Sequence, residues 1–300
     1  MFTDLPKFET AHRDIFIQQF FTGIHNSQNI RETGYIRINF VLFFEVKNNI
    51  WKELNTIGNI KDNIDVVHIC VPHYLHPVIS KYAIEKGVHV LCEKPLAANA
   101  KQAHKMVECA RKNGVALMEA MKSTLSPNFL AVKENIHRIG TPRRYFASFC
   151  QYSSRYDKFK EGIILNAFKP ELSNGAMMDI GIYTIYPMVA LFGRPKSISA
   201  QGIVLSSGAD GQGAVNMQYE GMNATVLYSK IANSALPTEI EGEEGNLLLD
   251  KIHITGKVDY IPRRKTEQGR EQDYSSTSIG RPLYHSEYYY EIAEFINLVE

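Results

Sequence analysis

The sequence predicts an α/β domain with a parallel sheet, followed by an α+β domain with a large, mostly antiparallel open sheet. Between residues 64 and 120, short apolar strands alternate with helices of about a dozen residues, which is typical of a right-handed parallel sheet. After residue 140 the strands follow one another directly, with one long helix inserted among them. We therefore expect a first domain at residues 1–122 and a second at 123–300.

The bulk composition is that of a globular protein and excludes several classes of function. A hydrophobic fraction of 44% and a charged fraction of 22% argue against disorder. A net charge of +1 offers no basic surface for nucleic acid. The apolar stretch Ile36–Val46 is too short and too polar to cross a membrane, and the first ten residues do not form a secretory signal. The absence of a CxxC pair favours a reduced, cytoplasmic protein. The four cysteines are Cys70, Cys92, Cys109 and Cys150.

The elements of the first domain can be predicted from Ile64 onward. Ile64–Val71 is rich in β-branched residues, which is typical of a buried parallel strand. Pro77 fits the first turn of the helix that follows, because its missing N–H costs nothing there. Gly87 ends that helix, and the second strand is Val88–Cys92.

A second crossover helix begins at the predicted N-cap Asn99, with Gln102 three residues later, and ends at Gly114. The third strand is Val115–Met118. The loops after parallel strands meet at one edge of the sheet, where ligands bind. The segments PHYLH, EKP and EAMK, which follow the three strands, should therefore line one crevice.

The second domain is predicted to consist of strands around one inserted helix. That helix runs from about Gly175 to Phe192, with Gly193 at its end and a bend at Pro187. A final helix begins near Ser286 and reaches Glu300 without a stop signal, which suggests a chain cut short. The predicted strands are Arg144–Tyr152, Ser197–Leu205, Ala214–Tyr219, Met222–Ile231, Thr238–Glu241 and Asn246–Asp250.

Lys94, Asp179 and Tyr183 are the candidate catalytic residues. Lys94 follows a buried strand, where a lysine can take part in proton transfer or hold a substrate hydroxyl. Asp179 and Tyr183 are four residues apart on the inserted helix and share a face. The alternatives are a solvated turn for EKP, a dipole-stabilising role for Asp179 and a half-buried core position for Tyr183.

Two further groups of polar residues stand near the predicted crevice. His73 and His76 have an HxxH spacing, but no third ligand is close in sequence, so we expect no metal site. Tyr152 and Arg155 offer a hydroxyl and a guanidinium to a polar substrate, or form an exposed strand end.

Four blocks of the sequence, in order, resemble the glucose–fructose oxidoreductase/inositol dehydrogenase (Gfo/Idh/MocA) family. They are VVHICVPHYLHP, GVHVLCEKPLAAN, LMEAMKSTLSPN and NGAMMDIGIYTIYPMVALFGRP, and the similarity runs from residue 64 to the end of the chain. The resemblance implies an N-terminal Rossmann domain and a C-terminal sheet domain that often forms the subunit contact. It also implies hydride transfer between NAD or NADP and a hydroxyl-bearing carbon of a sugar, cyclitol or diol.

The resemblance also implies roles for individual residues. Lys94 is similar to the lysine that contacts the reacting hydroxyl, with Asp179 beside it. Tyr183 stands where members similar to dihydrodiol dehydrogenase have tyrosine, so we expect Tyr183 and Lys94 to share the proton transfer. The residues implied on the nicotinamide side are Pro72, His73, His76, Glu93 and Lys122.

Residues 1–63 depart from the family because their glycines, Gly23, Gly34 and Gly58, form no Gly-rich phosphate loop. Ile36–Val46 could supply an inner strand, with Glu45 as a poor candidate for the ribose-binding acid. The leading hypothesis remains an NAD(P)-dependent oxidoreductase, expected to be a homo-oligomer without nucleic-acid or membrane partners. Its rival is a non-catalytic sugar or nucleotide-sugar binding protein, and a weaker alternative makes Lys94 a Schiff-base lysine.

Overall fold

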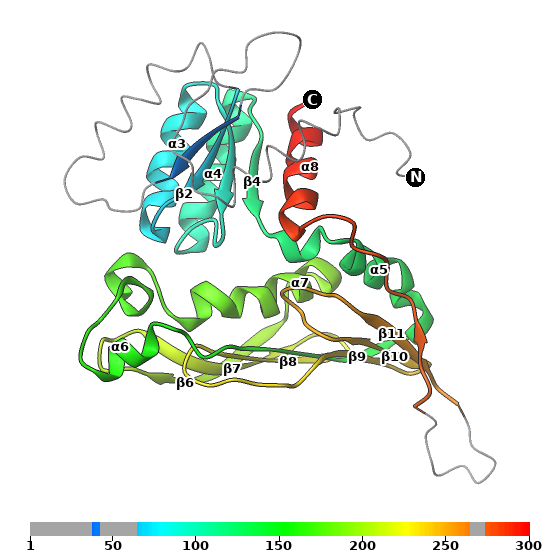
Figure 1. Ribbon diagram of the computed structural model, residues 1–300. Helices are drawn as coiled ribbons and strands as arrows, with labels where there is room; N and C mark the ends of the chain where they lie inside the picture. Colours follow the sequence, from blue (N-terminus) through cyan, green and yellow to red (C-terminus); the bar gives the residue numbers. More distant parts are fainter. Residues whose placement is uncertain (1–37, 43–64, 265–273) are drawn as a thin grey trace.

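The computed structural model describes the backbone of residues 38–42 and all of residues 65–264 and 274–300, which form two layers (Figure 1). The upper layer contains a four-stranded parallel sheet in the order β1-β2-β3-β4. The lower layer is an eight-stranded sheet. The upper elements are β1 (Ile38–Leu42), β2 (Val66–Cys70), α3 (His76–Glu85), β3 (His89–Glu93), α4 (Ala100–Asn113) and β4 (Leu117–Ala120).

The crossover helices follow the predicted signals closely. The side chain of Asn99 accepts a hydrogen bond of 3.0 Å from the backbone N–H of Gln102, which caps α4. Gly114 ends α4 in the left-handed conformation, with φ of 64°. The N-terminal stretch Ile36–Val46 contributes β1, which pairs with β2 at the edge of the described sheet rather than inside it. Glu45 and the glycines at positions 23, 34 and 58 lie outside the described residues.

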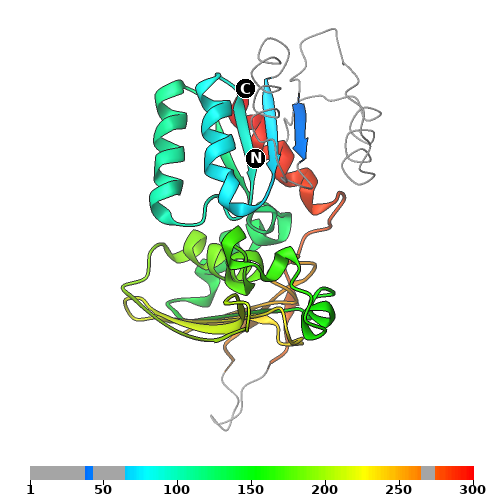
Figure 2. The ribbon, with the colours of Figure 1, turned by 90° about the vertical axis from the view of Figure 1, so that its left-hand side faces the viewer.

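Both faces of the parallel sheet are covered (Figure 2). Helices α3 and α4 lie on one face, where Ile79, Ala83 and Met106 pack against the strands. The final helix α8 (Glu287–Val299), which begins after Ser286 as predicted, returns to the opposite face. There Phe295, with 1% of its surface exposed, packs against residues of β2, β3 and β4.

The large sheet is mostly antiparallel, in the order β12-β11-β10-β9-β5-β8-β7-β6. The central pair β5 and β8 is parallel, which the sequence did not predict. The predicted turn at Glu220-Gly221 joins β7 to β8, and Gly221 has φ of 68°. The strands are β5 (Pro142–Cys150), β6 (Ser197–Val204), β7 (Asp210–Gln218), β8 (Asn223–Ser229), β9 (Thr238–Gly242), β10 (Gly245–Leu249), β11 (Val258–Pro262) and β12 (Thr277–Ser278).

Shorter helices connect these elements. Neither α5 (Pro127–Asn135) nor α6 (Tyr156–Lys160) was predicted from the sequence. The 3₁₀ turns are η2 (His73–Leu75), η3 (Lys122–Thr124), η4 (Ile136–Ile139), η5 (Asn166–Phe168) and η6 (Pro170–Leu172).

The inserted helix lies on the upper face of the large sheet, between the two layers (Figure 1). It consists of the π-helical turn η7 (Met177–Gly181) followed by α7 (Ile182–Phe192), with Pro187 inside and Gly193 at its end. Gly181 permits a close approach to the sheet, because a Cβ there would lie 3.1 Å from the ring of Tyr228. By length and composition alone the apolar stretch Pro170–Phe192 could cross a membrane, and in this fold its Ile180, Tyr183 and Met188 belong to the core on the large sheet.

Candidate active site

The candidate site lies where the carboxyl ends of β3 and β4 face the inserted helix. Lys94 follows β3 directly and Asp179 belongs to η7, so the two residues come from different layers. The N-terminus of η7 is held by Asp210 of β7, whose Oδ2 accepts a hydrogen bond of 2.7 Å from the backbone N–H of Met177. This contact orients the turn that carries Asp179.

Lys94 reaches across the interface between the layers to Asp179. Its Nζ donates hydrogen bonds to Oδ1 of Asp179, at 3.0 Å, and to the backbone oxygen of the same residue, at 2.7 Å. The same Nζ lies 4.9 Å from the centroid of the Tyr183 ring. The three predicted catalytic residues are thus in contact, although 85 positions separate Lys94 from Asp179.

A second lysine, Lys230, completes this cluster and was not predicted from the sequence. It follows β8, has 4% of its side chain exposed, and its Nζ donates to Oδ2 of Asp179 at 2.5 Å. A sequence signal existed, because Ala224, Val226 and Tyr228 occupy the inward positions of β8 and Lys230 continues their alternation. A lysine at an inward position of an alternating strand requires a buried partner.

The two ammonium groups determine the charge state of Asp179. Burial alone would raise the pKa of its carboxyl group, but Lys94 and Lys230 more than offset that effect and hold the pKa well below its usual range. Asp179 is therefore an ionised acceptor at neutral pH. Each of its oxygens serves one lysine.

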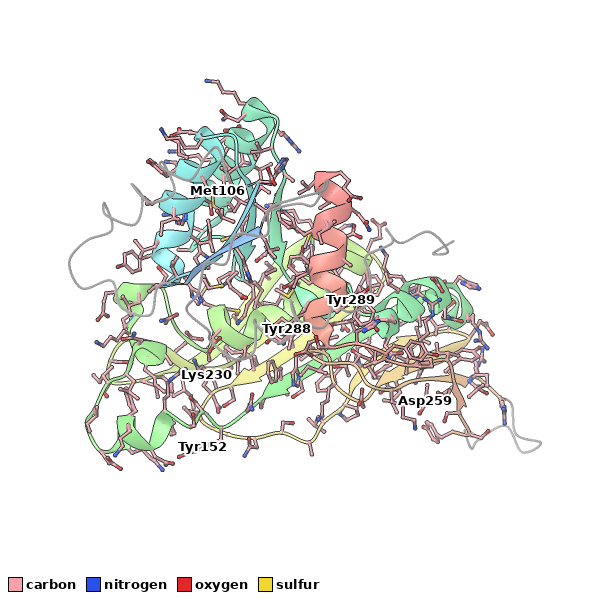
Figure 3. All side chains as sticks on the ribbon, turned by 45° about the horizontal axis from the view of Figure 1, so that its top comes forward. Met106, Tyr152, Lys230, Asp259, Tyr288 and Tyr289 are labelled. Carbon is pink, nitrogen blue, oxygen red and sulfur yellow. The ribbon has the colours of Figure 1, made fainter. Side chains whose placement is uncertain are left out.

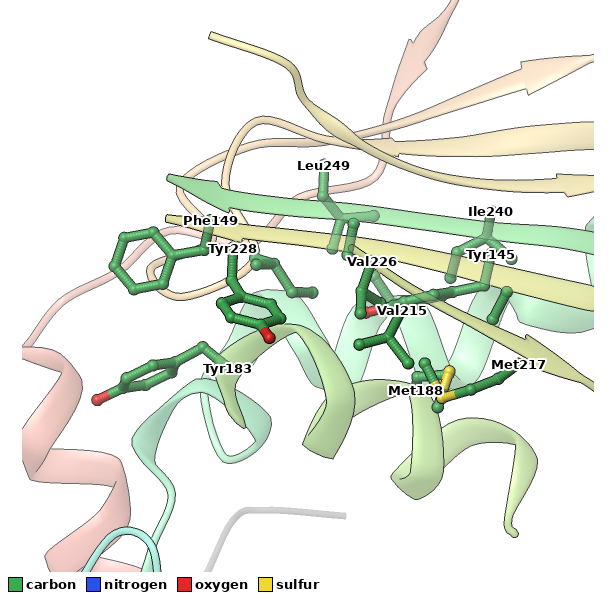
Figure 4. Close-up of a cluster of buried hydrophobic side chains, with 14 of the residues drawn as sticks. Tyr145, Phe149, Tyr183, Met188, Val215, Met217, Val226, Tyr228, Ile240 and Leu249 are labelled. Atoms are coloured by element: carbon green, nitrogen blue, oxygen red, sulfur yellow. The ribbon is translucent and has the colours of Figure 1, made fainter. Parts of the chain in front are cut away.

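Tyr183 is anchored in the aromatic part of the lower core. Its ring meets Phe149 edge-on at 5.7 Å, and Phe149 stacks on His253 at 3.7 Å. In Figure 4 the Tyr183 hydroxyl points away from the aliphatic cluster around Val215 and Val226. Burial, together with nearby acidic groups, raises the pKa of Tyr183 well above its usual range, so the phenol stays protonated.

The two histidines after β2 use their rings differently. His73 lies within 3.0 Å of the backbone oxygen of Ser173 through Nδ1, and burial lowers its pKa to about 4, so its ring is neutral at pH 7. His76 is fully buried, with ring nitrogens 2.8 Å from the oxygen of Pro95 and 2.9 Å from that of Val71. Burial lowers the pKa of His76 too, so its neutral ring donates through one nitrogen only.

Glu93 and Lys122 lie at the carboxyl ends of β3 and β4. Burial favours a raised pKa for Glu93, but His68 and Lys94 overcome it and the pKa is lowered. Lys122 forms an ion pair with Glu287 of α8 and lies 4.2 Å from the centroid of the Tyr288 ring. Lys122 therefore ties α8 to the segment that follows β4.

Tyr152 and Arg155 belong to the segment that leads into α6. The hydroxyl of Tyr152 donates to Asp157 at 2.7 Å, and Arg155 is an exposed residue at the start of α6. The segment runs beside Lys230, since the backbone N–H of Ser153 donates a hydrogen bond of 2.8 Å to the backbone oxygen of Lys230, and Figure 3 labels Tyr152 and Lys230 in the same region of the lower layer. Among the described residues, no recorded contact joins Tyr152 or Arg155 to Asp179, so their role in substrate binding stays a prediction.

His68, Cys70 and Glu93 offer three potential metal-ligand atoms within 4.8 Å of one another. Burial and the neighbouring Glu93 raise the pKa of the Cys70 thiol far above its usual range. The expectation of a protein without a metal site stays a prediction.

Comparison of the sequence with known proteins identifies the family of this chain. Residues 37–121 match the model described as "Oxidoreductase family, NAD-binding Rossmann fold", and residues 129–248 match the GFO/IDH/MocA C-terminal domain. The scyllo-inositol 2-dehydrogenase (NADP(+)) of Bacillus subtilis is 47% identical over 239 residues, which span 80% of this chain and 70% of that protein. The chain belongs to the Gfo/Idh/MocA family.

More distant relatives agree with this assignment. A trans-1,2-dihydrobenzene-1,2-diol dehydrogenase of Xenopus tropicalis is 32% identical over 181 residues, covering 59% of this chain and 52% of that protein. The aldose-aldose oxidoreductase from Caulobacter crescentus, solved with glycerol, superposes with a TM-score of 0.68 at 19% identity. That superposition covers 81% of this chain and 72% of the other and supports the fold.

As a Gfo/Idh/MocA member, the chain is an NAD(P)-dependent oxidoreductase acting on CH–OH groups. The described residues fit the nicotinamide end of such a cofactor. Half-buried polar side chains stand at the carboxyl ends of β2, β3 and β4, the edge where a parallel sheet binds ligands, and His73 among them is uncharged. The family match begins at residue 37, and the glycines before it lie outside the described residues.

Proposed function

We propose that this chain interconverts a ring hydroxyl and a ketone on an inositol-like polyol, with NADP as the cofactor. The observation that carries the proposal is the hydrogen bond of Lys94 to Asp179 beside the Tyr183 ring, at the end of the β3 strand. The relative that acts on scyllo-inositol and uses NADP supports the choice of substrate and cofactor.

Lys94 is the proton-transfer group in this proposal. The bound nicotinamide supplies the hydride acceptor or donor. Lys94 takes the hydroxyl proton during oxidation and returns it to the ketone oxygen during reduction. Tyr183, whose raised pKa keeps it a neutral phenol, donates a hydrogen bond to the same oxygen. Asp179 fixes the position of Lys94 Nζ.

The predicted cofactor residues take different parts in the proposal. His73, whose ring is neutral, would line the nicotinamide side of the crevice together with Pro72 and Glu93. His76 and Lys122 use their polar atoms inside the protein, so they hold the walls of the crevice. Tyr152 and Arg155 bind the outer hydroxyls of the substrate.

The test begins with fluorescence titration of NADPH and NADH into the purified protein, followed by oxidation of scyllo-inositol in the presence of NADP. Lys94→Met is expected to lower kcat by about 10³-fold or more, because it removes the proton-transfer group. NADPH affinity should stay within about threefold. Lys196→Met, which removes an exposed lysine paired with Glu220, serves as the matched control. Unchanged turnover in Lys94→Met would refute the proposal.

A second part of the proposal concerns assembly through the large sheet, in a protein that we continue to expect in the cytoplasm. Every residue of β6 is exposed, including Ile198 at 65% and Val204 at 69%. Both side chains belong to the edge strand of the large sheet, which offers unpaired backbone groups to a second copy. We expect a homo-oligomer by light scattering that Ile198→Glu/Val204→Glu converts to a monomer. A monomeric native protein would contradict this part.

A further inference from the structure

Lys230 has no part in the function proposed above, although it is the more buried of the two lysines on Asp179. Its side chain is 4% exposed and that of Lys94 is 14% exposed. Its Nζ lies 5.3 Å from the centroid of Phe168, a fully buried ring. At that depth Lys230 does not meet a substrate in the crevice. Any effect on the reaction must act through Asp179.

Within the hydrogen-bonded triad of Lys94, Asp179 and Lys230, two ammonium groups share one carboxylate, which leaves one positive charge in excess when both lysines are protonated. Glu93, whose pKa is lowered, interacts electrostatically with Lys94 from outside this triad. Other titratable groups face the cluster from neighbouring elements and interact electrostatically with Lys94 or Asp179. They are Glu93 of β3, Glu119 of β4, His73 of η2, His76 of α3 and Tyr183 of α7.

The excess charge has a consequence when Lys94 releases its proton. If Lys94 were the sole partner of Asp179, the half-buried carboxylate would then have no counter-charge. An unpaired, partly buried charge raises the free energy of the folded protein. With Lys230 on Oδ2, the remaining pair of Asp179 and Lys230 is neutral. We propose that Lys230 is a positioning residue that keeps Asp179 compensated and oriented while Lys94 cycles between ammonium and amine.

This inference rests on the proposed proton-transfer role of Lys94. In the oxidation direction, the neutral amine of Lys94 takes the hydroxyl proton as the carbon gives its hydride to the oxidised nicotinamide, and a C=O bond forms. The substrate loses two electrons and the cofactor gains them. Lys94 must then return to the amine form by releasing the proton to water. Lys230 holds the Asp179 carboxylate in place throughout.

The test compares pH profiles of scyllo-inositol oxidation by the native protein and by Lys230→Met. Without the second positive charge, Asp179 holds the ammonium form of Lys94 more firmly. The rising limb of kcat against pH should move upward by about one unit, so kcat on that limb should fall about tenfold. KM and NADPH affinity should stay within about twofold.

Matched variants separate this role from a structural one. Lys230→Arg keeps the charge and should keep the native pH profile. Lys257→Met removes a lysine 2.7 Å from Asp259, another largely buried aspartate, which Figure 3 labels on a different part of the lower layer. It should leave the profile unchanged. If Lys230→Met does not fold, Lys230→Gln carries the same test with a neutral side chain.

A second readout does not depend on turnover. Lys94 is acetylated at a series of pH values and its modification is followed by mass spectrometry. Half-maximal modification in Lys230→Met should need a pH about one unit higher than in the native protein. An unchanged labelling pH overturns the inference. If the native protein oxidises no polyol, the proposed function fails, and the labelling experiment still decides the influence of Lys230 on Lys94.

Discussion

Asp179→Asn tests the electrostatic description of the site through stability alone. The substitution leaves the side chains of Lys94 and Lys230 buried without the carboxylate between them. Asparagine offers one oxygen, and its NH₂ group meets an ammonium where the second carboxylate oxygen stood. We therefore expect the variant to fold but to melt at a clearly lower temperature.

The size of the effect follows from burial. Removal of one partner from a buried ion pair costs about 3–5 kcal/mol. The Asp179 side chain is 35% exposed, so water solvates part of it and we take the lower end, about 3 kcal/mol. For a domain of roughly 150–250 residues, each kcal/mol lost from the free energy of unfolding lowers Tm by roughly 2–4 °C. The Tm of Asp179→Asn should therefore be roughly 6–12 °C below the native value at pH 7.

The pH dependence gives an independent check of sign. The folded protein depresses the pKa of Asp179, so its contribution is present above the unfolded value of about 3.9 and is lost as the pH falls through the folded value. The difference in Tm between native protein and variant should be constant from about pH 5 to 8 and should shrink below about pH 4.

The assay is thermal unfolding followed by circular dichroism at pH 7 and at pH 3.5. Asp157→Asn, which changes a fully exposed aspartate paired with Lys160, is the matched control and should leave Tm nearly unchanged. A Tm for Asp179→Asn close to the native value at pH 7 would refute the reasoning, since the two lysines would then not need the carboxylate.

Three further predictions follow from particular residues. The Tm of Glu291→Gln should rise relative to that of the native protein between pH 5 and pH 9. Burial and Glu93 raise the pKa of Glu291 to about 8. The native protein therefore loses the stabilising protonated form of Glu291 as the pH rises through this value, whereas the variant has no proton to lose. Equal Tm differences at both pH values would contradict this. Phe168→Ala should lower the free energy of unfolding in urea by about 3–5 kcal/mol, because it leaves a cavity against Lys230; a loss under about 1 kcal/mol would show that the site collapses without cost. Tyr183→Phe should lower kcat about 10–100-fold with little change in Tm, since it removes a hydroxyl that lies outside the aliphatic core; native kcat would exclude the hydroxyl from the reaction.

The upper layer could be predicted because its signals are local. Asn99 caps α4, Gly114 ends it, and each buried strand lies within about two residues of its predicted position. The convergence of the segments after β2, β3 and β4 follows from parallel topology alone. For this reason Lys94 could be assigned to the carboxyl edge of the sheet before its contact with Asp179 was known.

The lower layer was less predictable because its pairing is long-range. The hairpin of β7 and β8 is set by a tight turn at Gly221, and the sequence indicates it. The parallel pairing of β5 with β8 joins residues about eighty positions apart, such as Tyr145 and Ala224, and no local signal marks it. Strand β11 was missed for a similar reason, since its pairing with β10 follows a loop without a tight-turn motif.

The same distinction explains why two of the three charged members of the cluster were found and one was not. Lys94 stands in a motif, and Asp179 shares a helix face with Tyr183, so each has a local pattern that draws notice. Lys230 continues the inward alternation of β8, but that local signal does not identify its partner, because the parallel pair that brings β8 to the centre of the sheet beneath η7 joins distant parts of the chain. Lys230 directly follows β8 of the large sheet and Asp179 lies in the helix packed on it, whereas Lys94 comes from the upper layer. The site is therefore asymmetric in construction. One lysine is free to exchange a proton at the crevice, and the other keeps the shared carboxylate in place for it.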